Sequence, residues 1–259
     1  MLKAILWDVD GTLAETERDA HRVAFNQAFE AFKLPWRWDV ERYGELLRIT
    51  GGRERILHDM AARTDAPVLA DEREQLARDL HARKNALYGQ LLVEQRITLR
   101  PGVTQLMDEA LRAGVRQAIV TTTSRVNVDA LLRLQFGASW RERFAAVVCG
   151  EDVHDKKPHP EGYERCLRLL AIGPLEAVAI EDSPGGVAAA RAASVPVVVP
   201  RSAYFATATI DGAIAIGPGL HTRRGWQPRC AGSAQDDSPV NLDDLRDWCA
   251  QMESVSQSF

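Results

Sequence analysis

Five short apolar runs lie along the chain, and residues at helical spacing separate most of them. The runs are typical of buried parallel strands and cover residues 4–7, 117–120, 145–149, 177–180 and 195–199. Apolar side chains recur every three or four residues near positions 103–111, 128–135 and 163–170, as expected for amphipathic helices. Alternating strands and helices predict an α/β fold, with a doubly wound, Rossmann-like parallel sheet and helices on both faces.

The stretch between the first two runs has a different pattern. It has no strand-like alternation, and its apolar positions form helical stripes at Phe25, Ala28, Phe29 and Phe32, at Ile56, Leu57, Met60 and Ala61, and at Leu76, Leu80, Leu87 and Leu91. So long an insertion indicates a small helical domain rather than a loop. We therefore expect a core domain made of residues 1–14 and 96–259 and a helical domain made of residues 15–95.

The C-terminal part starts with an aperiodic segment, residues 217–239, that is rich in Gly, Pro, Ser and Arg. This composition predicts an irregular surface segment. A last helix is expected from Asn241, with Leu242, Leu245, Trp248 and Met252 packing inward.

Composition and charge exclude several classes of protein. The 259 residues are 46% hydrophobic and 26% charged, and the formal net charge of −4 argues against nucleic acid or an anionic membrane as the main partner. The four cysteines are far apart and form no C-x-x-C pair, so no zinc site or disulfide framework is indicated. No segment resembles a signal peptide or a membrane span, and we expect a cytoplasmic monomer.

Polar side chains follow four of the five apolar runs. In an open parallel sheet such residues converge on one crevice at the carboxyl ends of the strands. They are Asp8 and Asp10, then Thr121, then Lys157, then Glu181 and Asp182. Four carboxylates in one place are costly without a cation, and a hard divalent ion such as Mg²⁺ resolves the conflict.

Each of these signals alone has an ordinary interpretation. "DVDGT" is compatible with an Asp-Gly turn, Thr121 and Lys157 with a strand-end hydroxyl and a solvated lysine, and "EDSPGG" with a helix N-terminus capped by Ser183. The neighbouring Thr122 and Thr123 compete with Thr121, and Lys156 competes with Lys157. The order of the whole set makes the functional interpretation the stronger one.

Taken in that order, four segments resemble the four motifs of the haloacid dehalogenase superfamily: "DVDGT", the threonine of "IVTTTS", the lysine of "KKP" and "EDSPGG". The helical insertion resembles the cap domain of its β-phosphoglucomutase-like branch. "TTTS", "TGGRERI" and "EDSPGGVAAARAA" look most like the CbbY-type sugar bisphosphate phosphatases associated with the Calvin cycle. One departure is Ser194, which ends a predicted helix where the family more often has glycine.

The resemblance implies a Mg²⁺-dependent phosphatase that acts through an aspartyl phosphate. Asp8 would be the nucleophile, and Asp10 would be the general acid and then the base. Thr121 would bind the phosphoryl oxygens, and Lys157 would offset their charge. Metal ligands would come from Asp8, Asp10 through its backbone carbonyl, Glu181 and Asp182.

The expected substrate is a small phosphorylated sugar, with xylulose 1,5-bisphosphate or a related pentulose bisphosphate preferred by resemblance. Glu17 and His21 would meet sugar hydroxyls, although their i, i+4 spacing also fits a surface pair. Arg53 and Arg55 of "TGGRER" would bind the second phosphate, although a plain glycine turn with solvated charges is an equal alternative. Thr122 and Ser124 would be further substrate contacts.

Three other functions compete with this interpretation. A sugar phosphomutase would use the same residues but would return the phosphoryl group to a second position of the sugar. A haloalkanoate dehalogenase would need neither the acid Asp10 nor the carboxylates for Mg²⁺. A non-catalytic phosphate-binding module would keep the fold without turnover, and the intact set of polar residues argues against it.

Overall fold

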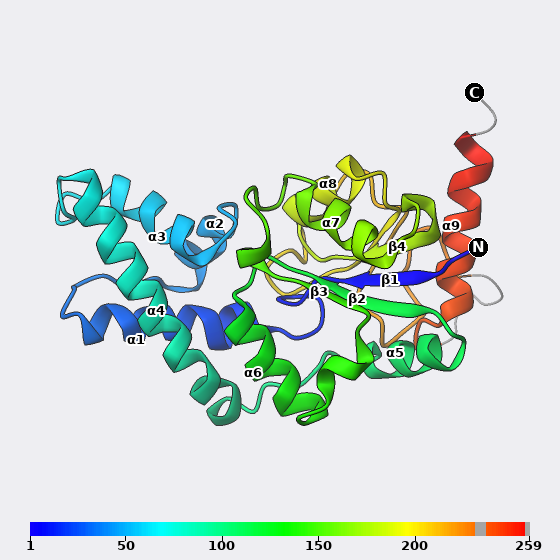
Figure 1. Cartoon of the computed structure of the whole chain (residues 1–259), viewed down its shortest axis with the longest axis horizontal. Coiled ribbons are helices and arrows are strands. Elements are labelled where there is room, and N and C mark those ends of the chain that lie inside the picture. Colours follow the sequence, from blue (N-terminus) through cyan, green and yellow to red (C-terminus); the bar gives the residue numbers. More distant parts are fainter. Residues whose placement is uncertain (231–236, 257–259) are drawn as a thin grey trace.

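A six-stranded parallel sheet lies at the centre of the computed structural model, which describes residues 1–230 and 237–256 (Figure 1). Its strands run in the order β3-β2-β1-β4-β5-β6. Their bounds are β1 Ala4–Trp7, β2 Arg116–Val120, β3 Ala146–Val148, β4 Ala177–Ile180, β5 Val197–Pro200 and β6 Ala215–Gly217. The five predicted strands are present. β6 was not predicted, because its three residues are too few to show a pattern in the sequence.

The central strand β1 has a parallel partner on each side. Ala4 lies opposite Arg116 of β2 and opposite Ala177 of β4. All four residues of β1 are buried, because alternate side chains enter two different apolar clusters. Ile5 and Trp7 belong to one cluster, and Ala4 and Leu6 to the other.

Helices cover both faces of the sheet, which confirms the predicted fold class (Figure 1). One face carries α5 Val103–Arg112, α6 Arg125–Phe136 and α9 Leu242–Ser256, and the other carries α7 Glu161–Leu170 and α8 Pro184–Ala192. Short 3₁₀ turns at Trp140–Arg143, Gly150–Asp152 and Pro174–Glu176 complete the connections.

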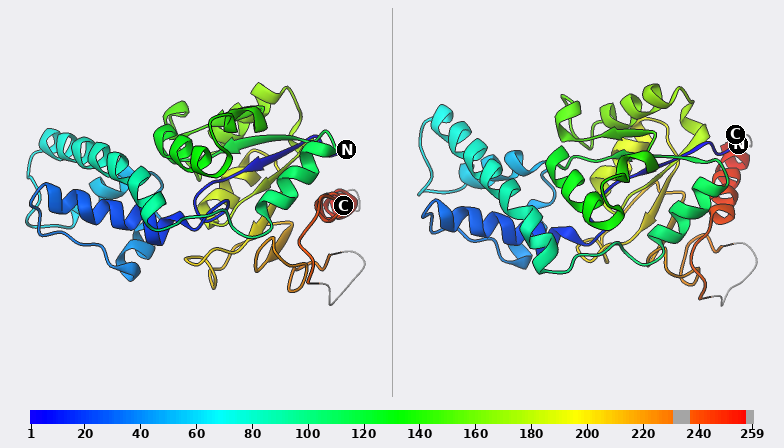
Figure 2. Two further views of the ribbon diagram at one scale, coloured as in Figure 1. Left: turned by 90° about the horizontal axis from the view of Figure 1, so that it is seen from below. Right: turned by 60° about the horizontal axis from the view of Figure 1, so that its bottom comes forward.

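The insertion after β1 is helical, as predicted, and forms a cap beyond the carboxyl ends of the strands (Figure 2). A π-helical turn, Glu17–His21, leads into its four α-helices. These are α1 Arg22–Ala31, α2 Val40–Leu46, α3 Gly52–Ala61 and α4 Ala70–Glu94. Their common core is strongly aromatic and includes Phe25, Phe29, Trp38 and Tyr43, whereas Phe32 of the predicted stripe is exposed.

The segment 217–239 is irregular, but in its described part it is not confined to the surface. Leu220, Trp226 and Cys230 are buried, and Trp226 stacks on Trp248 of α9 with ring centroids 4.8 Å apart. The predicted surface segment is therefore wrong for these residues, because their side chains fill the space under α9. Residues 231–236 lie outside the described part of the chain.

The last helix is confirmed. Asn241 caps it by accepting the backbone N–H of Asp244, and Leu242, Leu245 and Trp248 are buried. Among the described helices, none is both long enough and apolar enough to span a lipid bilayer.

Candidate active site

The carboxyl ends of β1, β2 and β4 bring together side chains that are far apart in the sequence. Asp8 follows β1 directly and is 7% exposed. The ammonium of Lys157 donates to Asp8 Oδ1 at 2.7 Å and to the carbonyl of Val120 at 2.8 Å, and it lies 2.5 Å from Glu181 Oε1. One buried lysine thus bridges two carboxylates at the edge of the sheet.

The structure places the two alternative lysines at different sites. Lys157 contacts Asp8, whereas Lys156 extends to the cap and contacts Glu54 Oε1 at 2.6 Å. The three threonines all line the same cleft. Thr121 is buried, and its hydroxyl accepts the backbone N–H of Thr123, whose own hydroxyl donates to Asp10.

Burial and close charges change the pKa values of this group. Burial raises the pKa of Asp8 to about 7, although the charge of Lys157 opposes this effect. Burial and the neighbouring Asp8 also raise the pKa of Asp182 well above its ordinary value. Burial alone would lower the pKa of Lys157, but the carboxylates of Asp8 and Glu181 outweigh it and raise that pKa. The site therefore favours an additional cation.

The carboxylates of Asp8, Glu181 and Asp182 form a buried group whose ligand oxygens lie within 4.8 Å of one another. One of them, Glu181 Oε2, is buried and has no hydrogen-bond partner within residues 1–230 and 237–256. An all-oxygen, anionic donor set with an unsatisfied carboxylate oxygen suits Mg²⁺. Gly11, with a φ of +85°, passes so close to Asp182 that a Cβ on it would clash with that carboxylate.

The carboxylate of Asp10 has other partners, so only its backbone carbonyl remains for a metal. Its oxygens accept hydrogen bonds from the hydroxyls of Thr16 and Thr123, and His21 Nε2 lies 2.9 Å from Oδ1. Burial would raise the pKa of Asp10, but the His21 contact and the two hydroxyls outweigh it and hold this pKa below its usual range. Asp10 is therefore ionised in this arrangement.

Glu17 and His21 do not form the surface pair that their spacing allowed. The hydroxyl of Tyr43 donates to Glu17 Oε2 at 2.6 Å, while His21 contacts Asp10 and stacks on Tyr88 at 4.3 Å. Both residues lie on the π-helical turn, whose wider winding gives their side chains separate partners.

The two arginines of "TGGRER" occupy different environments. Arg55 is buried, and its guanidinium donates to the Tyr43 hydroxyl at 2.9 Å and to the Leu46 carbonyl at 3.2 Å. Arg55 also lines the cleft, but the structure shows its guanidinium held by Tyr43 and Leu46, so its role at the second phosphate stays a prediction. Arg53 has a side chain that is 44% exposed, and it lines the cleft at the start of α3.

A cleft of about 630 Å³ between cap and core connects these groups. Thr122 and Ser124 line it from the core, and the hydroxyl of Ser124 accepts the amide of Asn85 from α4 at 3.3 Å. The volume of this cleft lies in the usual range for small-ligand sites, about 300–1,000 Å³.

Several residues at this site escaped the sequence analysis. Tyr163 donates to Glu181 Oε1 at 2.5 Å, and Lys84 is buried with its ammonium 5.3 Å from the centre of the Phe25 ring and 5.0 Å from that of Tyr88. Tyr163 occupies an apolar position of a helix, and Lys84 belongs to no motif. No sequence signal distinguished them from core and surface residues.

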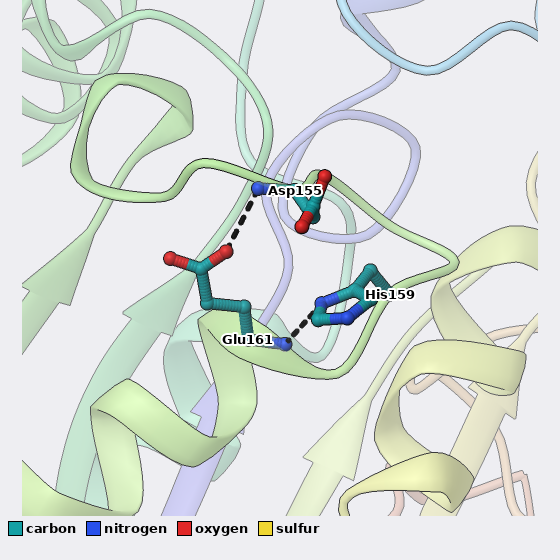
Figure 3. Close-up of side chains that lie close together, drawn as sticks. All are labelled: Asp155, His159 and Glu161. Atoms are coloured by element: carbon teal, nitrogen blue, oxygen red, sulfur yellow. Dashed lines mark hydrogen bonds between the residues drawn. The ribbon is translucent and has the colours of Figure 1, made fainter.

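A second group of possible metal ligands, Asp155, His159 and Glu161, lies on the turn before α7 and at the first residue of that helix (Figure 3). The Glu161 carboxylate accepts the backbone N–H groups of His154 and Asp155, and His159 Nδ1 accepts the N–H of Glu161. Asp155 and His159 are exposed. These hydrogen bonds close the turn, so the group needs no metal.

Comparison with known proteins agrees with this geometry. The family of haloacid dehalogenase-like hydrolases matches residues 2–194. The chain belongs to this family. The protein CbbY of Cereibacter sphaeroides is 45% identical over 204 residues, which are 79% of this chain and 86% of that protein. Within the haloacid dehalogenase-like hydrolases the chain is thus a phosphatase of the CbbY family.

Solved structures show the same relationship. CbbY from Rhodobacter sphaeroides in complex with phosphate has a TM-score of 0.76 and 44% identity, and the match covers 82% of this chain and 92% of that one. A variant of the same protein in complex with xylulose-(1,5)bisphosphate has a TM-score of 0.79 and 42% identity, and the match covers 85% of this chain and 95% of that one. A β-phosphoglucomutase from Clostridium difficile has a TM-score of 0.72 and 16% identity, and the match covers 98% of this chain and 100% of that one. This similarity shows a shared fold.

Proposed function

We propose that this CbbY-family phosphatase hydrolyses a pentulose bisphosphate, with xylulose 1,5-bisphosphate as the first candidate, and that it depends on Mg²⁺ and forms an aspartyl phosphate. The observation that carries the proposal is the bridge from Lys157 to Asp8 and Glu181 below the cleft. It holds a carboxylate beside an ammonium at the point where a phosphoryl group would enter.

The first step that we propose is attack by an oxygen of Asp8 on phosphorus, with cleavage of the bond between phosphorus and the sugar oxygen. Lys157 favours the ionised form of Asp8 against the effect of burial and offsets the charge of the phosphoryl oxygens, while the Thr121 hydroxyl donates to one of them. Bound by Asp8, Glu181, Asp182 and the Asp10 carbonyl, Mg²⁺ would neutralise the phosphate oxygens and so lower the repulsion felt by the nucleophile.

Asp10 would transfer the proton in both halves of the reaction. It gives a proton to the departing sugar oxygen, and it later accepts one from the water that attacks the aspartyl phosphate, which regenerates Asp8 and releases phosphate. In the arrangement described here His21 and Thr123 hold Asp10 ionised, which suits the second half. An incoming phosphate dianion raises the pKa of Asp10 and thereby favours the protonated form for the first half.

The substrate class is supported by the relative that binds xylulose-(1,5)bisphosphate and by the cap. A bisphosphate needs a second cationic site away from Asp8. Arg53 faces the cleft at the first turn of α3, where free backbone N–H groups also favour an anion. Glu17 and His21 are proposed sugar contacts, and residues 15–95 are proposed to close over the core as one cap domain.

The test is phosphate release from xylulose 1,5-bisphosphate, xylulose 5-phosphate and glucose 1-phosphate, with Mg²⁺ and with excess chelator. We expect the highest kcat/KM for the bisphosphate, and no release in chelator. Phosphorus NMR of the products separates hydrolysis from mutase activity, because a mutase yields an isomerised sugar phosphate instead of free phosphate. A preference for monophosphates would contradict the proposed substrate class.

A further inference from the structure

An ion pair crosses the cleft between core and cap. Lys156 belongs to the core segment after β3, and Glu54 belongs to the first turn of α3 in the cap. Lys156 Nζ lies 2.6 Å from Glu54 Oε1, and both residues line the cleft. Their side chains are 23% and 33% exposed, so the pair is partly shielded from water but open to a ligand.

The hydrogen bonds of this pair are incomplete. An ammonium has three donors, and in the described part of the chain Glu54 is the one acceptor recorded for Lys156 Nζ. The other oxygen of Glu54, Oε2, is buried and has no hydrogen-bond partner among the residues that the structure describes. The pair therefore retains donors and an acceptor that a polyhydroxylated, anionic ligand can use.

The local charge also favours an anion. The guanidinium of Arg53 lies 4.0 Å from Glu54 Oε1, so two cations flank a single carboxylate. The Lys156 ammonium lies so near the backbone of Gly51 that a Cβ on this glycine would come within 2.8 Å of it. It therefore lies at the N-terminal turn of α3, where the cap offers its backbone N–H groups.

The two consecutive lysines line the same cleft but contact different parts of it. Lys157 contacts the proposed nucleophile Asp8 in the core, while Lys156 contacts Glu54 in the cap, beside Arg53. A substrate with one phosphate at Asp8 and a second anionic group at the cap would meet one lysine at each of these groups.

We propose that Lys156 is a specificity-determining residue that extends from the core and binds the second anionic group of the substrate together with Arg53. The proposal rests on the bisphosphate substrate proposed above. Glu54 orients the ammonium of Lys156 and separates it from Arg53 until the substrate arrives. The competing explanation is a simple latch, in which the ion pair only holds the cap closed.

The main quantity measured is the ratio of kcat/KM for xylulose 1,5-bisphosphate to kcat/KM for xylulose 5-phosphate. The variants are Lys156→Met, Lys156→Arg and Glu54→Gln. Lys3→Met is the matched control, because Lys3 forms an ion pair of similar length with Glu176, 2.5 Å, at the opposite end of β1. Binding of both sugars is also measured by calorimetry in an Asp8→Asn background, which prevents turnover.

We expect Lys156→Met to lower the ratio by about 10- to 100-fold, the value of one charge-assisted contact, and Lys156→Arg to restore it to within a few-fold. Glu54→Gln should leave the ratio unchanged or raise it, because it removes a negative charge from the anion site. Lys3→Met should leave it unchanged. Calorimetry should show weaker binding of the bisphosphate to the Lys156→Met, Asp8→Asn double variant than to Asp8→Asn alone.

Two results would overturn the proposal, and they differ from each other. If Lys156→Met and Glu54→Gln lower kcat/KM for both substrates equally, the ion pair is a latch, and the bisphosphate substrate still stands. If the unaltered protein shows no preference for the bisphosphate, the substrate class is wrong, and the role of Lys156 falls with it.

Discussion

At the scale of single residues, the charge of Asp8 matters more than its shape. Asp8 is buried next to Lys157 and close to Glu181 and Asp182, so asparagine at position 8 fits the same space while it removes one of three crowded carboxylates. We expect Asp8→Asn to abolish phosphate release while the circular dichroism spectrum and cooperative unfolding are retained. Activity above a few per cent of the original value would exclude covalent catalysis by this residue.

Lys84 makes the stability of the protein depend on pH. Burial lowers its pKa to about 7 from 10.5, and Asp10 and Glu17 only partly oppose this change. Below about pH 7 the lysine is protonated in both the folded and the unfolded chain, so the folded protein carries the full cost of a buried ammonium. Between pH 7 and 10.5 the unfolded chain binds more protons, so this cost falls as the pH rises.

Lys84→Met should therefore raise the Tm most at low pH. We expect a gain of a few degrees near about pH 6.5 and a smaller gain near about pH 9.5, measured by thermal unfolding in both buffers. Replacement of the exposed Lys33 by methionine is the control, and its effect should not vary with pH. A gain that grows with pH would mean that the ring contacts with Phe25 and Tyr88 stabilise the charged form.

At the scale of elements, the sequence predicted most of the fold. Strands β1 to β5 follow from short continuous apolar runs, and the cap helices follow from apolar residues at helical spacing. The sequence did not predict β6 or the buried part of residues 217–239. Trp226 and Cys230 pack through tertiary contacts, which leave no repeat in the sequence. The candidate site shows the same division. Strand ends located Asp8 and Lys157, but the partners of Asp10 and Arg55 depend on how the cap folds back.

The C-terminal end of α8 offers a direct test of backbone strain. Ser194 adopts a φ of +60°, the left-handed region, just after the helix. Glycine adopts this conformation without steric cost, so we expect Ser194→Gly to stabilise the protein by about 0.5–1 kcal/mol in urea unfolding. Ser194→Ala should give no gain, since alanine has the same steric cost. A loss of stability with glycine would show that the serine side chain contributes more than the strain.

At the scale of the whole molecule, metal binding should stabilise the fold. The carboxylates of Asp8, Glu181 and Asp182 come from two strands of the sheet, so an ion that binds them binds only the folded chain. We expect Mg²⁺ to raise the Tm, with a gain of about 2.7 kcal/mol at a concentration 100 times the dissociation constant. Asp182→Asn should reduce this gain strongly. An equal rise in both proteins would show that Mg²⁺ acts elsewhere.

The position of β1 in the centre of the sheet also affects the order in which the cap and the core can fold. β1 is synthesised long before its partners β2 and β4, because the pairs Ala4–Arg116 and Ala4–Ala177 join residues that are far apart in the chain. Such distant pairing is slow, whereas the cap helices are all encoded within residues 15–95. Pulse-labelled hydrogen exchange during refolding should therefore protect cap amides before those of β1. Asp8, the proposed nucleophile, is synthesised before the strands that position it, so we expect it to become competent only when nearly the entire core has been made.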